Sequence, residues 1–153
     1  MTTTTAPPVD GRVIGLAHYA SRAVLEGVLA RHGISFPQSV TLRLAAVAEG
    51  PVDRARLTGD VVGALKIGRP EADGLVDDLF TAGLLALDEP SLVRITEAGR
   101  KLHDTTSAGT RAVSARIYAG IPSDELAVTG RVLALVTERA DRESAAGAAT
   151  PDQ

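Results

Sequence analysis

The sequence contains no cysteine and no tryptophan, and it has only two tyrosines and two phenylalanines among 153 residues. The absence of cysteine excludes disulfide bonds, thiolate metal sites and cysteine-based redox sensing. Because large aromatic side chains are so few, the core is expected to consist of Leu, Val, Ile and Ala. Such a core favours packed helices over a sandwich of sheets.

Long apolar runs and an excess of positive charge are also missing. No uninterrupted apolar stretch approaches the ~18 residues that cross a membrane, and the start, MTTTTAPP, lacks the features of a secretory signal. We therefore expect a cytoplasmic protein with no membrane partner. The net charge of −3 leaves DNA binding open, because a DNA-binding chain can carry its basic residues locally.

The two ends of the chain differ in composition from its middle. Residues 1–9 are rich in Thr and Pro, and residues 144–153 in Ala, Gly, Thr and Pro. Neither segment can bury an apolar face, so we expect a disordered arm and a disordered tail. The remaining residues, 10–143, suit one compact domain.

Apolar residues in this domain recur at spacings of three and four, which predicts amphipathic helices. Asp10 and Thr96 are suitable N-caps, and Gly33, Gly83 and Gly120 are suitable helix ends. Short apolar runs on both sides of a turn predict one hairpin. The expected helices cover about 10–32, 37–50, 53–65, 70–83, 96–120 and 122–143, and the expected strands are 84–87 and 92–95, joined by a turn at 88–91.

The helices at 53–65 and 70–83, followed by the hairpin, have the order of a winged helix-turn-helix. The segments LVDDLFTAGLLAL and VRITEAGRKL resemble the recognition helix, wing strands and following helix of the MarR family. The most specific matches are AGLL at 82–85 and ITEAG at 95–99, and the AGIP break at 119–122 resembles the family's end region. The resemblance covers about residues 10–142.

This resemblance implies a mainly α-helical protein with a winged helix-turn-helix at about 37–95. It implies that the flanking helices, at about 10–32 and 96–143, form a dimerisation domain. It also implies a homodimer with a hydrophobic cleft between that domain and the winged helix, where small aromatic or phenolic ligands often bind in this family. The expected function is that of a ligand-responsive transcriptional regulator that binds double-stranded DNA.

Cationic side chains suited to DNA phosphates lie mostly at the edges of the predicted winged helix. They are Arg54, Arg56, Lys66, Arg69 and Arg94.

The predicted recognition helix departs from the family by being acidic. Between 69 and 84 it carries one arginine and four carboxylates, a net charge of −3. With Leu75, Val76, Leu79 and Phe80 facing the core, Asp73 and Asp77 are expected on the groove-facing side with Gly74 and Thr81. Arg, Lys, Asn and Gln make the common base contacts, and carboxylates oppose the phosphate backbone.

The predicted wing is short and acidic as well, since its tip reads Asp88-Glu89-Pro90-Ser91. Two functions therefore remain open at this point. One is a regulator with unusual DNA contacts. The other is a MarR-like protein that has lost DNA binding and binds or converts a small metabolite in the cleft.

The sequence favours a protein that is not an enzyme. It contains no nucleophile motif, phosphate-binding loop or paired catalytic carboxylates, so no catalytic residue and no cofactor are assigned. His18, His32 and His103 form no set of metal ligands at suitable spacing.

Residues of the first helix are candidates for ligand binding, because that helix borders the cleft in the family. Arginine there could bind a carboxylate through two hydrogen bonds; the alternative is an ordinary solvated helix face. The candidate ligand-binding residues are Arg12, His18, Tyr19, Arg22, Phe36 and Tyr118.

Overall fold

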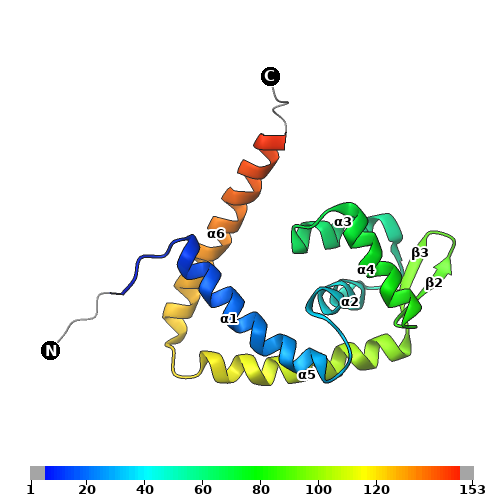
Figure 1. The fold of residues 1–153 in the computed structure, drawn as a ribbon, viewed down its shortest axis with the longest axis horizontal. Coiled ribbons are helices and arrows are strands. Elements are labelled where there is room, and N and C mark those ends of the chain that lie inside the picture. The colour runs from blue at the N-terminus through cyan, green and yellow to red at the C-terminus, as the bar shows by residue number, and fades with distance from the viewer. Residues whose placement is uncertain (1–5, 149–153) are drawn as a thin grey trace. The chain divides into compact units, whose positions relative to one another are not determined.

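The computed structural model describes residues 6–148, most of them helical (Figure 1). These residues divide into two compact units, 6–114 and 115–148, and the boundary falls within the fifth helix. The elements are α1 (Gly11–Ala30), α2 (Phe36–Val47), β1 (Val52–Asp53), α3 (Arg54–Leu65), α4 (Arg69–Thr81), β2 (Leu85–Glu89), β3 (Leu92–Ile95), α5 (Glu97–Tyr118) and α6 (Ser123–Ala148).

Capping side chains explain where several helices begin, and two of them, Asp10 and Thr96, are the predicted ones. Asp10 accepts a hydrogen bond from the Val13 N–H at the start of α1, and Ser35 and Gln38 form a reciprocal capping box at the start of α2. The predicted cap Thr96 accepts from the Gly99 N–H at the start of α5. These contacts satisfy N–H groups that have no partner inside the helix.

The core of the first unit lies between α2, α3, α4 and the strands. Leu42, Leu57, Val76, Leu79 and Val93 are each no more than 1% exposed, and they belong to one buried cluster together with Leu29, Ile34, Ala45 and Leu85. The predicted aliphatic core is therefore confirmed for this unit. Burial of each such side chain contributes roughly 1.5–3 kcal/mol relative to leaving it in water.

The strands form a three-stranded antiparallel sheet in the order β1-β3-β2. The predicted hairpin is confirmed, with Leu85 opposite Ile95 and Leu87 opposite Val93. Two details differ: β2 continues through a bulge to Glu89, into the predicted turn, and β1 adds a strand in which Val52 pairs with Val93. A strand of two residues has no alternating pattern of its own, so only its pairing with β3 defines it.

The second unit consists of the last residues of α5 and all of α6. No residue of α6 is buried. Its exposed apolar residues Val128, Val132, Leu135 and Val136 recur at helical spacing and therefore form one stripe. The segment 144–148, predicted as part of the tail, continues α6; its alanines favour the helix. The rest of the predicted tail and residues 1–5 of the predicted arm lie outside the described residues.

Among the described helices, α1 alone has the length and hydropathy to cross a membrane. Its apolar residues are interrupted by polar ones, so it contains no long uninterrupted apolar run. It carries an Arg22–Glu26 ion pair of 2.8 Å, and Val28 and Leu29 are buried near its end. One such helix is weak evidence for a membrane span, because core helices of soluble proteins meet the same criterion.

Candidate functional site

The helix-turn-helix consists of α3 and α4, with β2 and β3 as the wing (Figure 1). Ala72, Val76 and Leu79 attach α4 to the core. The residues of α4 left exposed define what we call the α4 face, which is the surface available to a DNA groove. It consists of Arg69, Pro70, Glu71, Gly74, Asp77, Asp78 and Thr81.

Asp73 does not belong to the α4 face, so its predicted groove-facing position is wrong. It is half-buried, and its Oδ1 accepts a 2.8 Å hydrogen bond from the hydroxyl of Thr58, a fully buried residue of α3. Ala72, which is completely buried, lies in line with the predicted inward residues Leu75, Val76, Leu79 and Phe80. Asp73 is ~100° around the helix from Ala72, so it lies at the flank of the buried face, beside α3.

Acidic residues of the helix-turn-helix and wing pair with two of the predicted DNA-binding cations. The guanidinium of Arg54 donates to Asp77 Oδ1 at 2.7 Å and lies over the Phe80 ring, 5.4 Å from its centroid. On the wing, Arg94 Nε lies 3.5 Å from Asp88 Oδ1. Asp77 and Asp88, two acidic residues that would repel DNA phosphates, therefore also pair with arginines that are predicted to bind DNA.

The other three predicted DNA-binding residues, Arg56, Lys66 and Arg69, are exposed. Arg56 lies in the first turn of α3, Lys66 at its left-handed C-cap with φ 56°, and Arg69 at the first position of α4. All five cations thus lie on α3, α4 and β3 of the first unit. Their contact with DNA stays a prediction.

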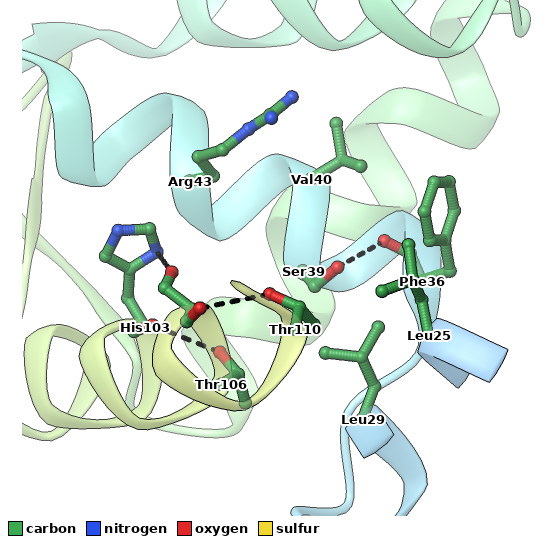
Figure 2. A pocket seen from close by; sticks show the side chains of 10 residues that line it. Leu25, Leu29, Phe36, Ser39, Val40, Arg43, His103, Thr106 and Thr110 are labelled. Carbon is green, nitrogen blue, oxygen red and sulfur yellow. Dashed lines mark hydrogen bonds between the residues drawn. The ribbon is translucent and has the colours of Figure 1, made fainter. Parts of the chain in front are cut away.

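A cavity of about 180 Å³ lies in the first unit among α1, α2 and α5 (Figure 2). For scale, a cavity of ~150 Å³ is large enough to hold benzene. Figure 2 shows side chains of α5 facing side chains of α2 across this space. The lining residues are Leu25, Leu29, Phe36, Ser39, Val40, Arg43, His103, Thr106, Ser107 and Thr110.

Hydrogen bonds within the helices limit what the hydroxyl groups of the cavity can do. Ser39 donates to the Phe36 carbonyl at 2.8 Å, Thr106 to the Leu102 carbonyl at 2.8 Å, and Thr110 to the Ser107 carbonyl at 3.2 Å. Their oxygens therefore remain available mainly as acceptors, for instance for a phenolic O–H.

The donors that remain for an anion are Arg43 and His103. Arg43 is exposed and forms no ion pair or hydrogen bond with any residue that the structure describes. His103 Nδ1 lies 3.5 Å from the hydroxyl of Ser107. An apolar space with a guanidinium at its edge suits an aromatic ring that carries a carboxylate.

The predicted ligand-binding residues are only partly brought together. Phe36 lines the cavity, and the guanidinium of Arg22 lies 4.8 Å from the centroid of its ring. Three others, Arg12, His18 and Tyr19, are exposed on α1 and do not line this cavity, while Tyr118 belongs to the second unit. A ligand contact by these residues stays a prediction.

Sequence reasoning missed Arg43 and the polar residues that α5 contributes. The signal for α5 was present, because its stripe at Thr106 and Gly109 is made of small residues. A Cβ on Gly109 would lie 3.0 Å from Val28 Cγ1 of α1. Small residues on one helix let a neighbouring helix approach closely, but only the packing shows which side chains line the space beside that contact.

Among the comparisons with known proteins, solved structures alone match the chain, and those described below share one architecture. No protein-family model and no curated protein sequence matches the chain. Among solved structures, CouR from Rhodococcus jostii RHA1 bound to p-coumaroyl-CoA has a TM-score of 0.72 at 23% identity, covering 83% of this chain and 90% of that one.

Two further solved structures are similar. The Mycobacterium tuberculosis MarR family protein Rv2887 in complex with DNA has a TM-score of 0.66 at 21% identity, covering 86% of this chain and 98% of that one. NadR in complex with 4-hydroxyphenylacetate has a TM-score of 0.68 at 20% identity, covering 90% and 98%. With its mostly helical chain and small winged sheet, the protein has the fold of MarR-type transcriptional regulators.

Proposed function

We propose that the protein is a homodimeric, ligand-responsive DNA-binding transcriptional regulator of the MarR type. The observation that carries this proposal is the presence, in one compact unit, of a winged helix-turn-helix and an aliphatic cavity with a guanidinium at its edge. Similar structures include one complex with DNA and two with aromatic ligands.

DNA binding is assigned to α3, α4 and the wing. In a helix-turn-helix, the second helix enters the major groove and the first crosses the phosphate backbone. Arg56, Lys66 and Arg69 are exposed on these helices and supply charge for phosphates. The α4 face carries Glu71, Asp77 and Asp78, so most of the affinity is assigned to phosphate contacts and little of it to base readout.

Dimerisation is assigned to the helices α6 and α1, whose apolar side chains are exposed to solvent in the single chain. On α6, the stripe of Val128, Val132, Leu135 and Val136 is 41–49% exposed. On α1, the large exposed apolar residues are Leu16, Tyr19 and Val24, at 63%, 69% and 48%. A second copy of the chain would remove these surfaces from water, and a twofold axis would present two α4 helices to a palindromic site.

The ligand assigned to the cavity is a small aromatic or phenolic acid. Leu25, Leu29 and Val40 would contact the ring, and Arg43 would pair with the carboxylate. The hydroxyl oxygens of Ser39 and Thr110 would accept from a phenol. For DNA to be released, the ligand must bind more tightly to the arrangement of the two winged helices that does not fit DNA.

Fluorescence polarisation with labelled duplex DNA from upstream of the gene tests the proposal. The full-length wild type should bind, with affinity that falls steeply as salt rises. Arg69→Ala should weaken binding and lower the salt slope by about 0.9 per protomer. Arg131→Ala, on α6, is the control and should change neither. Absence of binding at low salt by a folded protein would contradict a role in DNA binding.

A second candidate function is a MarR-like protein without DNA binding that binds or converts a small metabolite in the cavity. The carboxylates of the α4 face favour it. In the same experiment it predicts no DNA binding at any salt concentration, together with stabilisation of the fold by an aromatic acid.

A further inference from the structure

The pair of Arg54 and Asp77 is the best-defined charged contact of the helix-turn-helix. Arg54 Nη2 donates to Asp77 Oδ1 at 2.7 Å, and the guanidinium lies over the Phe80 ring, 5.4 Å from its centroid. The Arg54 side chain is 35% exposed and that of Asp77 63% exposed. The pair therefore lies at the surface, at the border between α3 and the α4 face.

The three aspartates of α4 have different partners. Asp73 accepts from the neutral hydroxyl of Thr58, and Asp78 lies 3.4 Å from the amide of Gln38. Only Asp77, among the acids of α4 in the part of the chain that the structure describes, forms an ion pair with a cation. Removing its charge would free an arginine; removing the charge of Asp78 would not.

We propose that Asp77 sets the strength of DNA binding by holding Arg54 in an internal ion pair, so that Asp77 and the DNA phosphates compete for one guanidinium. This inference rests on the proposed DNA-binding function. Arg54 begins α3, the helix expected to cross the phosphate backbone. While paired with Asp77 it adds no net charge to that surface.

The size of the competition follows from the exposure of the pair. Ion pairs between exposed side chains shift an equilibrium by a factor of roughly 1.5 to 5. Contact between a freed arginine and one phosphate also releases about 0.9 counterions from duplex DNA. Loss of the pair should therefore change both the affinity and its salt dependence.

The experiment compares the full-length wild type with Asp77→Asn in a salt titration against a labelled random-sequence duplex. Such a duplex suffices because phosphate contacts do not depend on sequence. Asp77→Asn should tighten binding roughly 1.5- to 5-fold per protomer and steepen the salt slope by about 0.9 per protomer.

Two further variants distinguish the release of Arg54 from a general loss of repulsion between the carboxylates of α4 and the DNA phosphates. Asp78→Asn removes the adjacent charge of the same helix and should leave the slope unchanged. In an Arg54→Gln background, Asp77→Asn should no longer steepen the slope. Melting temperatures establish that each variant folds, and Asp77→Ser provides a second removal of the charge.

The outcomes distinguish the two proposals. If the wild type binds DNA and Asp77→Asn leaves affinity and slope unchanged, the competition is refuted while DNA binding stands. An equal gain for Asp78→Asn, or an undiminished gain in the Arg54→Gln background, also overturns it, because repulsion alone would then explain the effect. If the folded wild type and Asp77→Asn both fail to bind at low salt, both proposals are wrong.

Discussion

Residues at the junction of α4, the wing and α5 tolerate little substitution, because their backbones pack directly against one another. Gly99 is buried in the first turn of α5, and a Cβ there would overlap the Leu84 carbonyl oxygen and lie 2.8 Å from Ile95 Cγ1. The same carbonyl accepts the Thr96 N–H at 3.0 Å, and the Thr96 hydroxyl donates to the Gly83 carbonyl at 2.7 Å. The TEAG segment therefore joins the wing to α5 by direct backbone packing.

Gly99→Ala should destabilise the protein by about 1–3 kcal/mol, because the added methyl group forces backbone to move in a packed junction. Chemical denaturation followed by circular dichroism measures the change in free energy of unfolding. Gly59→Ala is the matched control: Gly59 is exposed within α3 with open space around it, so alanine should stabilise by about 0.5–1 kcal/mol. Equal stability of the two variants would contradict this account of the junction.

At the scale of elements, α6 is the helix whose structure is least explained by one chain. It runs for 26 residues without burying any of them, although most helical stability in proteins comes from packing of an apolar face. Its stripe of Val128, Val132, Leu135 and Val136 therefore calls for a partner surface, and the proposal assigns that surface to a second copy.

Val132→Asp should convert the dimer into monomer, because it places an unpaired charge within the apolar stripe. Light scattering coupled to size-exclusion chromatography measures the mass. Thr137→Asp introduces the same charge on the opposite side of α6, at an exposed position, and should leave the dimer intact. A wild type that is monomeric at all concentrations, or a Val132→Asp variant that remains dimeric, would refute the assigned interface.

Prediction of the elements from sequence succeeded where a local signal existed. Asp10 and Thr96 mark helix starts through side-chain hydrogen bonds to nearby N–H groups, and a spacing of three and four residues marks the buried faces. It failed for β1, which exists only through pairing with β3, and for the orientation of Asp73. Asp73 lies at the flank of the buried face of α4, and only the packing of α3 beside it shows that Thr58 is its partner.

At the scale of the whole molecule, the proposed regulation requires that the cavity and the DNA-binding surface affect each other. Coupling of this kind is reciprocal: a ligand that weakens DNA binding must itself bind more weakly when DNA is present. The cavity lies where α2, part of the winged-helix core, meets α1 and α5. A ligand there contacts elements whose rearrangement would move the winged helix.

Arg43→Gln should abolish the rise in melting temperature that 4-hydroxyphenylacetate produces, because the carboxylate loses its charged partner. The variant should keep its DNA affinity, while the acid should no longer lower it. Thermal shift and fluorescence polarisation measure the two effects. Arg111→Gln, an exposed position of α5 outside the cavity lining, is the control. A normal response to the acid in Arg43→Gln would exclude this role for Arg43.

The order of the helices and of the two wing strands, the aliphatic composition of the core and the acidic character of α4 are properties of the sequence by itself. They depend on local periodicity, capping and side-chain charge, which the chain carries without reference to its neighbours. The partners of the acids and the residues that line the cavity were decided only by the tertiary structure. Arg54 and Asp77 are 23 positions apart, and Arg43 and His103 meet at one cavity only because α2 and α5 pack together.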